Sequence, residues 1–389
     1  MLIITIITFI VVFGLLIFLH ELGHFLTARK FGVRVEEFGF GLPPRLGGLV
    51  KEEGKWKVVG PQYQSSSQQT VYSINWIPFG GFVKLYGEDG EHAEEKDSFG
   101  AQGAGKRAVI LSAGVTMNAL LTVVLLTAGF LGGTPSVIDE QLPRGAQVRD
   151  AQVQIVNVVA DSPAARAGLH VGDVITRVDE ISLASVEEFQ RYTAANQGKE
   201  ITLAFNRENE ARTAKVVPEI LSNQPGRAII GVALIRTGIV SYPWYRALPQ
   251  GVIATGELAA SLVKGFSHII GQLLSTGRSD SSVSGPVGIA VLTGQVVKLG
   301  FIYLVQFTAT LSLNLAILNY LPIPALDGGR VLFIIVEKLR GKAVNRKLEA
   351  VIHTVGFALL LLLIAFITYK DIVRFGAGIF NSFKHALTG

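Results

Sequence analysis

Two histidines and a glutamate stand within five residues near the start of the chain, in the pentapeptide His20-Glu21-Leu22-Gly23-His24. On a helix, residues four apart lie on one face, so the imidazoles of His20 and His24 can bind a single Zn²⁺ ion. Glu21 would then reach a water molecule held by the metal and act as a general base. This spacing predicts hydrolysis of peptide bonds by a zinc metalloprotease.

The apolar run that precedes the motif places these groups inside a membrane. Residues 1–19 read MLIITIITFIVVFGLLIFL. Ionisable side chains are costly in hydrocarbon and are retained there mainly for function. Hydrophobic residues make up 49% of the chain and charged residues 17%, and the mean hydropathy is +0.43, which indicates a membrane protein. The alternative is a pair of helix histidines with satisfied hydrogen bonds at the membrane edge.

The absence of cysteine narrows the possible chemistry. It excludes disulfides, Cys-ligated zinc and a thiol nucleophile, and leaves His, Asp and Glu as metal ligands. A net charge of +5 and a pI near 9.3 would suit nucleic acid, but the basic residues flank apolar segments, where membrane topology explains them. We therefore expect lipid contact and no nucleic-acid partner.

Four segments are long and apolar enough to span a membrane, namely residues 2–28, 107–131, 299–321 and 350–370. The first has no basic n-region and no small-residue cleavage site, so we expect it to be retained and not removed as a signal peptide. Eleven Lys or Arg lie between residues 27 and 107, and six lie between 321 and 349. The positive-inside rule places both loops in the cytoplasm and both chain termini outside it.

A zinc site with two histidines needs a third protein ligand and an open position for water. The segment from Asn319 to Arg330 reads NYLPIPALDGGR and follows the third span. Its prolines break the helix, and the glycines after Asp327 let the backbone approach another element. Irregular backbone at membrane depth persists only where it is buried in protein or lines a cavity. Asp327 is therefore the best candidate for the third ligand, with a helix-capping Asp as the alternative.

HELGH in the first span and NYLPIPALDGG after the third together resemble the motifs of the site-2 protease family, the intramembrane zinc metalloproteases. That family combines HExxH with an N-x-x-P-x-P-x-L-D-G motif. The resemblance implies that His20, His24 and Asp327 bind Zn²⁺ and that Glu21 is the general base. It also implies that Asn319 grips the substrate or stabilises the oxyanion.

Residues 35–84 resemble the membrane-reentrant β-sheet of the same family. EEFGFGLPPRL is followed by NWIPFGGFVKLYGE, which contains a loop of the form P-x-G-G-[YF]-V-K. The residues expected to present a strand edge are Gly80, Gly81, Phe82 and Val83. An unwound substrate could pair with such an edge and present its peptide bond to the metal. The alternative is an ordinary hairpin packed on the helices.

Polar residues in the second and fourth spans have less specific interpretations. Gly114 and Asn118 match the family's G-x-x-x-N pattern, without the proline that many members place two residues after the glycine. Asn118 is expected to help hold the substrate or the neighbours of the zinc, and helix packing through Gly114 is an equally good interpretation. His353 is expected to make a polar contact within the bundle, because hydrolysis needs the fourth zinc position for water.

Residues 150–236 have a different composition and resemble a PDZ domain of the circularly permuted bacterial type, with AGLHVGD at 167–173 as its signature. A PDZ fold binds an extended peptide at a sheet edge. The groove residues expected from the strand order are Ile230, Gly231, Val232, Phe189 and Tyr192. The alternative is a size filter that blocks substrates with bulky outer domains and binds no peptide tail.

The resemblance covers nearly the whole chain and predicts a polytopic α-helical membrane protein. Its fold class is a four-span zinc metalloprotease core with a membrane-reentrant β-sheet and an inserted PDZ-like α+β domain. The expected segments are a first transmembrane helix at 1–34, a cytoplasmic-side or reentrant β region at 35–106, a second helix at 107–131, the PDZ-like domain at 150–236, interfacial amphipathic helices at 237–298, a third helix with the LDG motif at 299–330, a cytoplasmic loop at 331–349 and a fourth helix at 350–375.

The expected function is cleavage of single-span membrane proteins within the membrane, after another protease has removed the outer domain. By resemblance, membrane-tethered anti-sigma factors and remnant signal peptides are the expected substrates. One alternative is another class of HExxH membrane peptidase, whose third ligand is usually a downstream Glu. The other is a non-catalytic PDZ-bearing scaffold, which gains nothing from both Glu21 and Asp327. A bacterial inner membrane is the expected location, with the PDZ-like domain outside the cytoplasm; a plastid membrane is the alternative.

Overall fold

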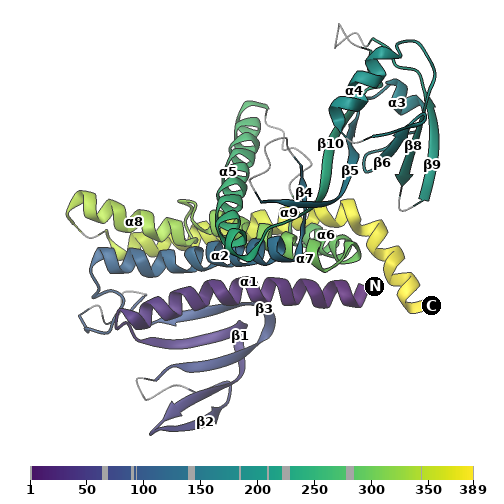
Figure 1. Ribbon diagram of the computed structural model, residues 1–389. Helices are drawn as coiled ribbons and strands as arrows, with labels where there is room; N and C mark the ends of the chain where they lie inside the picture. The colour runs from purple at the N-terminus through teal and green to yellow at the C-terminus, as the bar shows by residue number, and fades with distance from the viewer. Residues whose placement is uncertain are drawn as a thin grey trace. The chain divides into compact units, whose positions relative to one another are not determined.

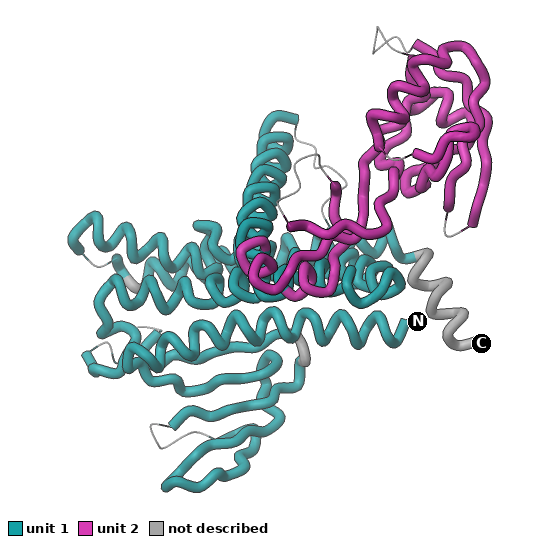
Figure 2. The backbone as a smooth tube through the Cα atoms, viewed as in Figure 1, with its two compact units in different colours: residues 1–127, 251–389 teal, residues 128–250 magenta. Residues whose placement is uncertain are grey.

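Two compact units make up the protein (Figure 2): residues 1–127 with 251–389 form unit 1, and residues 128–250 form unit 2. The structure is a computed structural model. It describes residues 2–63, 69–88, 92, 94–138, 145–183, 185–207, 210–220, 228–276, 284–342 and 344–388.

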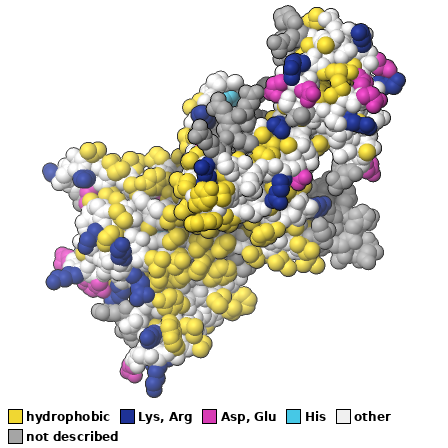
Figure 3. Space-filling view, viewed as in Figure 1, with side chains coloured by type: hydrophobic (Ala, Val, Ile, Leu, Met, Phe, Trp, Pro, Cys, Tyr) yellow, Lys and Arg dark blue, Asp and Glu magenta, His cyan; other side chains and the backbone are white. Residues whose placement is uncertain are grey.

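In the described part of the chain, four helices are long and apolar enough to cross a membrane, and they lie in unit 1 except for the last residues of one of them. They are α1 (Leu2–Lys30), α2 (Ala104–Gly132), α7 (Phe301–Asn319) and α9 (Arg346–Thr388). Each overlaps one of the four expected spans, and α9 extends beyond residues 350–370 at both ends. Apolar side chains cover much of the visible face of this unit, with Lys and Arg gathered at one end (Figure 3). Such a surface suits contact with lipid.

Three further helices occur in the described chain between the second and the fourth of these helices: α5 (Trp244–Thr276), α6 (Pro286–Leu299) and α8 (Asp327–Arg340). The third spanning helix ends at Asn319, and α8 begins at Asp327. The LDG motif therefore lies in a loop and at a helix N-terminus, and it does not continue the third span.

Helices α1 and α2 lie side by side and are in backbone contact (Figure 1). A Cβ on Gly23 would stand 2.4 Å from the carbonyl oxygen of Ala113, which is too close for any side chain. The glycine inside the HELGH motif is thus required for this approach. As a result, the histidines on α1 are held against the backbone of α2.

Asp371 in α9 caps α6 from outside that helix. Its side chain is buried, and its Oδ2 accepts the backbone N–H of Gly288 at 2.7 Å. Gly285, at the N-cap position of α6, has no side chain that could satisfy this first-turn donor. A carboxylate at a helix N-terminus is also favoured by the helix dipole. The capping contact joins α6 to the fourth spanning helix.

A sheet of order β2-β1-β3 lies along α1 (Figure 1), with β1 at Val35–Glu52, β2 at Lys55–Val59 and β3 at Val71–Leu85. The first half of β1 lies between the two halves of β3, because Phe38 is opposite both Val83 and Tyr72. The outer edge of residues 81–85 pairs with no strand in the part of the chain that the structure describes. This sheet therefore has a free strand edge.

The described residues of unit 2 form a seven-stranded sheet and two short helices. The strands follow the order β4-β10-β5-β6-β8-β9, and β7 pairs with β6. Their bounds are β4 Thr134–Val137, β5 Gln147–Val158, β6 Val174–Val178, β7 Ile181–Ser182, β8 Ile201–Arg207, β9 Glu210–Val216 and β10 Val232–Ser241; the helices are α3 Pro163–Arg166 and α4 Val186–Ala195. Buried apolar side chains such as Ile155, Leu203 and Ile230 form one core.

A buried ion pair ties the turn before β6 to the end of β8. Asp173, 1% exposed, accepts hydrogen bonds from Arg207 at 2.7 and 2.8 Å and from the backbone N–H of His170 at 2.8 Å. Burial alone would raise the pKa of Asp173, but these hydrogen bonds outweigh it and hold that pKa below its ordinary value. The pair therefore stabilises unit 2 above the pKa of an unfolded Asp, about 3.9, and loses this effect as the pH falls through the folded pKa.

We expect Asp173→Asn to destabilise unit 2 by about 3 kcal/mol at pH 7, because Arg207 loses its anionic partner. The variant should also lose less stability than the wild type between pH 5 and strongly acidic pH. Hydrogen exchange of β6 and β8 peptides in the full chain, corrected for intrinsic exchange rates, measures both effects. Glu180→Gln, at an exposed position in the following turn, is the control. An unchanged acid response in Asp173→Asn would contradict the assignment.

Candidate metal centre

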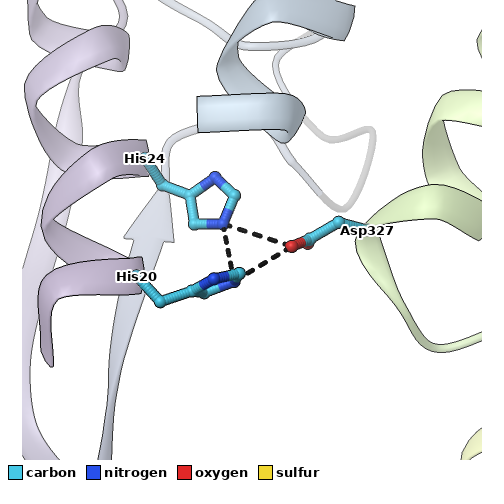
Figure 4. Close-up of side chains that lie close together, drawn as sticks. All are labelled: His20, His24 and Asp327. Atoms are coloured by element: carbon cyan, nitrogen blue, oxygen red, sulfur yellow. Dashed lines mark hydrogen bonds and ion pairs between the residues drawn. The ribbon is translucent and has the colours of Figure 1, made fainter. Parts of the chain in front are cut away.

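Three side chains from two distant segments meet beside α1 (Figure 4). His20 and His24 lie one turn apart on α1, and Asp327 is the first residue of α8. The Nε2 atoms of the two histidines are 3.2 Å apart, and Asp327 Oδ2 is 3.0 Å from that of His20 and 3.4 Å from that of His24. Both histidines are buried, at 5% exposure. The structure therefore brings together the three predicted ligands.

The donor set fits zinc. Ligand atoms held tetrahedrally at about 2.0–2.1 Å from Zn²⁺ stand roughly 3.3 Å apart, close to the three distances measured here. Two imidazole nitrogens and one carboxylate oxygen are also a common catalytic zinc set, which leaves a fourth position open. The position of Asp327 at the N-terminus of α8 favours its anionic form, since the helix dipole is positive there.

The second ring nitrogen of each histidine has a polar neighbour. His24 Nδ1 donates to the carbonyl oxygen of Ile110 at 2.8 Å, which leaves Nε2 with a free lone pair for a metal. The side-chain amide of Asn118 lies 3.5 Å from His20 Nδ1. An Nδ1–H group on His20 needs an acceptor, and the Asn118 amide oxygen has no other partner among the described residues. When that oxygen faces His20, both groups are satisfied.

Asn118 is completely buried, at 0% exposure, and its backbone carbonyl accepts the hydroxyl of Ser312 at 2.8 Å. Of the two roles expected for it, contact with a neighbour of the zinc is therefore the one that its surroundings favour. Asn319, the last residue of α7, lies on another side of the centre, with Nδ2 3.5 Å from His20 Nε2. Its amide thus lies next to the three clustered side chains.

Glu21 faces the sheet edge. It lies on α1 next to residues 81–85, the free edge of β3. Gly81 lies beside it, since a Cβ there would stand 3.5 Å from Glu21 Cγ and 3.0 Å from the carbonyl oxygen of Gly39. Gly80 contacts α1 one turn earlier, at Ile17. The catalytic-base candidate and the strand edge of Gly80 to Val83 are therefore neighbours.

Gly114, which was not among the predicted site residues, also lies at the centre. A Cβ on this residue of α2 would stand 2.4 Å from His24 Nε2 and 2.7 Å from His20 Nε2. A hydrogen at this position leaves the ligand nitrogens free. The G-x-x-x-N pattern was the available signal, but whether the glycine faces another helix or the metal ligands depends on the rotation of α2 about its axis.

The residues expected to form a peptide groove in unit 2 lie close together. Phe189 and Ile230 are buried in one core, against which Tyr192 and Val232 pack. Gly231 has a φ of +82°, and its carbonyl oxygen accepts the N–H of Val159 at 2.9 Å. Strand β10 pairs with β4 only from Thr237 onward, so on that side residues 232–235 have no strand partner in the described chain. The strand edge at 232–235 is therefore open in the described chain, whereas the Phe189 and Ile230 side chains are buried.

A sequence model of peptidase family M50 matches residues 8–61 and 58–363. The chain belongs to peptidase family M50. This M50 peptidase is 30% identical to the zinc metalloprotease RasP of Geobacillus kaustophilus, over 95% of this chain and 98% of that protein. It is 31% identical to a putative zinc metalloprotease of Clostridium acetobutylicum, over 94% and 96% of the two chains. The regulator of sigma-W protease RasP of Bacillus subtilis is 29% identical, over 95% and 98%.

M50 membership confirms the resemblance to the site-2 proteases that the sequence analysis identified. The M50 peptidase is therefore a zinc metalloendopeptidase of this type and a multi-pass membrane protein, and its described residues contain four helices long and apolar enough to span a membrane. Among solved structures, the PDZ domain of the SdrC-like protein of Listeria monocytogenes is similar to it at 28% identity, over 23% of this chain and 92% of that chain, with a TM-score of 0.21.

Proposed function

We propose that this M50 peptidase cleaves single-span membrane proteins inside or next to their spans, with His20, His24 and Asp327 as zinc ligands and Glu21 as general base. The observation that carries the proposal is the triangle of ligand atoms, with sides of 3.0 to 3.4 Å, on α1 and at the start of α8. It lies among helices of membrane-crossing length, with a carboxylate and a free strand edge beside it.

The chain's own residues account for the steps of hydrolysis. When bound, zinc acidifies a water molecule and polarises the scissile carbonyl. Glu21 accepts the proton of that water and delivers it to the leaving amine. The Asn319 amide donates a hydrogen bond to the oxyanion that develops on the carbonyl. No covalent intermediate forms between enzyme and substrate.

The strand edge presents the substrate. In a helical span each backbone carbonyl is already hydrogen-bonded, so the peptide bond to be cut must first leave the helix. Gly80, Gly81, Phe82 and Val83 offer unpaired backbone groups with which an unwound segment pairs as an added strand. The closeness of Glu21 to Gly81 supports this arrangement, because it places the proton acceptor at the same edge.

Unit 2 is the PDZ-like domain and stands outside the cytoplasm, as do both chain termini. The basic loops at residues 27–107 and 321–349 support this orientation, because they favour the cytoplasmic side. Unit 2 excludes substrates whose outer domains are still folded. The free edge at residues 232–235 supports a second role, the binding of an extended peptide tail in the groove near Tyr192.

The physiological substrates are membrane-tethered anti-sigma factors whose outer domains have been removed by a first protease, and remnant signal peptides. A relative that matches along nearly its whole length is named regulator of sigma-W protease, which supports the first class. The relatives named above are all bacterial, which supports a bacterial inner membrane as the location.

The test uses two membrane-inserted substrates with the same span, one with a short outer segment and one with a folded outer domain. We expect at least a tenfold faster cleavage of the short form, because unit 2 obstructs the other. Fragments are quantified in membranes with wild type and with Asp327→Asn, which must abolish cleavage of both forms. Equal cleavage of the two substrates would contradict the exclusion of outer domains. A free C-terminal peptide that saturably changes the rate would support tail binding.

A further inference from the structure

The loop that carries Asp327 into the centre contains a strained residue. Ala325 has a φ of +79°, a left-handed conformation that is unfavourable for any residue with a Cβ. Such a conformation is strained and persists only where the surroundings hold it. Ala325 stands two residues before Asp327, so whatever holds it also determines where the carboxylate lies.

Two residues one turn apart on α9 hold this loop. His353 Nδ1 accepts the backbone N–H of Ala325 at 2.9 Å. Pro324 packs directly against Gly356, because a Cβ on this glycine would stand 2.4 Å from Pro324 Cβ and 2.9 Å from the Pro324 carbonyl oxygen. The first contact is a hydrogen bond to Ala325, and the second is close packing against Pro324, the residue before it. The fourth spanning helix thus clamps the loop immediately before Asp327.

The hydrogen bond also explains why a histidine occurs in this apolar helix. His353 Nε2 is buried and has no hydrogen-bond partner among the described residues, and the Phe333 ring lies 5.4 Å from the imidazole. An imidazole in an apolar span is costly unless its polar atoms are used. The bond to Ala325 is the one compensation found in the described part of the chain. The hydrogen bond to Ala325 occupies the Nδ1 atom of His353. His353 is also not one of the three residues whose possible metal-binding atoms cluster.

We propose that His353 is a positioning residue of the metal centre: its Nδ1 holds Ala325 in the left-handed conformation and thereby keeps Asp327 directed at His20 and His24. This inference rests on the proposed role of Asp327 as a zinc ligand. It makes the zinc affinity dependent on α9, a helix that contributes no ligand. Residues that orient metal ligands typically change affinity 10- to 100-fold when they are replaced.

The test is a zinc titration of the purified full-length protein in detergent against a chelating zinc indicator. We expect His353→Leu, which has no acceptor, to weaken zinc binding about tenfold and to lower kcat with KM nearly unchanged. His353→Asn keeps an acceptor close to the position of Nδ1 and should restore both quantities to within about threefold of wild type. His353→Gln moves the acceptor outward by one methylene and should behave like the Leu variant. His268→Leu, at an exposed position of α5, is the matched control.

Hydrogen exchange of the peptide that contains Ala325 provides a readout independent of metal and activity. We expect faster exchange in His353→Leu and His353→Gln than in wild type and His353→Asn. The proposal would be overturned if His353→Gln showed wild-type zinc affinity and wild-type exchange. It would also be overturned if His353→Asn and His353→Gln lost zinc affinity to the same extent. Both comparisons can be made even if the Leu variant does not fold. Asp327→Asn in the same titration separates the two hypotheses: if it binds zinc like wild type, the ligand assignment itself is wrong.

Discussion

Glu21→Gln is expected to abolish cleavage of a single-span substrate while zinc stays bound. Glutamine has nearly the same shape but cannot accept the proton of the attacking water. General-base catalysis contributes about 10² to 10⁴ in rate, so we expect cleavage to fall by at least about 10²-fold. The ligand atoms of His20, His24 and Asp327 are unchanged by the substitution. The measurements are fragment formation in membranes and the zinc content per mole of purified protein.

Two further variants make this result specific. Asp327→Asn should lose both zinc and cleavage, because a neutral amide is a poor zinc ligand. Glu257→Gln makes the same chemical change at an exposed position of α5 and should behave like wild type. Wild-type cleavage by Glu21→Gln would mean that another group removes the proton. Loss of zinc in that variant would mean that Glu21 shapes the metal site itself.

Gly114→Ala is expected to remove zinc from the protein almost completely, although it adds only a methyl group. The new Cβ would lie 2.4 Å from His24 Nε2 and 2.7 Å from His20 Nε2, so at least one imidazole must move off the metal. Withdrawal of α2 to make room would open the close packing of its backbone at Ala113 against Gly23 of α1. We expect less than about a tenth of the wild-type zinc content, and cleavage reduced in proportion.

The control for this prediction lies on the same helix. Gly105→Ala makes the same change where a Cβ meets nothing within 4 Å, and it should leave zinc and cleavage unchanged. Thermal unfolding and gel filtration of both variants test whether the fold is retained. A folded Gly114→Ala protein with a full complement of zinc would show that α2 does not close off the ligand nitrogens as the structure indicates.

The three side chains proposed as ligands could be singled out from the sequence because each has a local signature. The spacing of His20 and His24 needs only a helix to place two imidazoles on one face. Asp327 stands between two prolines, which break a helix, and two glycines, which let the backbone approach another element. The four spans were predictable for a similar reason, since about 20 consecutive apolar residues are required to cross hydrocarbon.

Contacts between distant segments were not predictable in this way. No local pattern indicates that Asp371 caps α6, that His353 binds the N–H of Ala325, or that Gly114 faces the ligand nitrogens. Each depends on the rotation of a helix about its axis and on the approach of residues far apart in the chain. The start of α8 at Asp327 was not predictable either. The apolar composition of the third span does not indicate which direction the chain takes after Asn319.

The amino-acid sequence alone therefore determined the chemistry: two histidines, a glutamate and an aspartate of the kinds that zinc-dependent hydrolysis needs, on segments of membrane-crossing length. Only the tertiary structure decided their mutual placement, with Oδ2 of Asp327 within 3.4 Å of both imidazoles and Glu21 at a free strand edge. The physical reason is that ligand type and helical periodicity are properties of neighbouring residues. The distance between α1 and α8, in contrast, is determined by the packing of α2 and α9 against them.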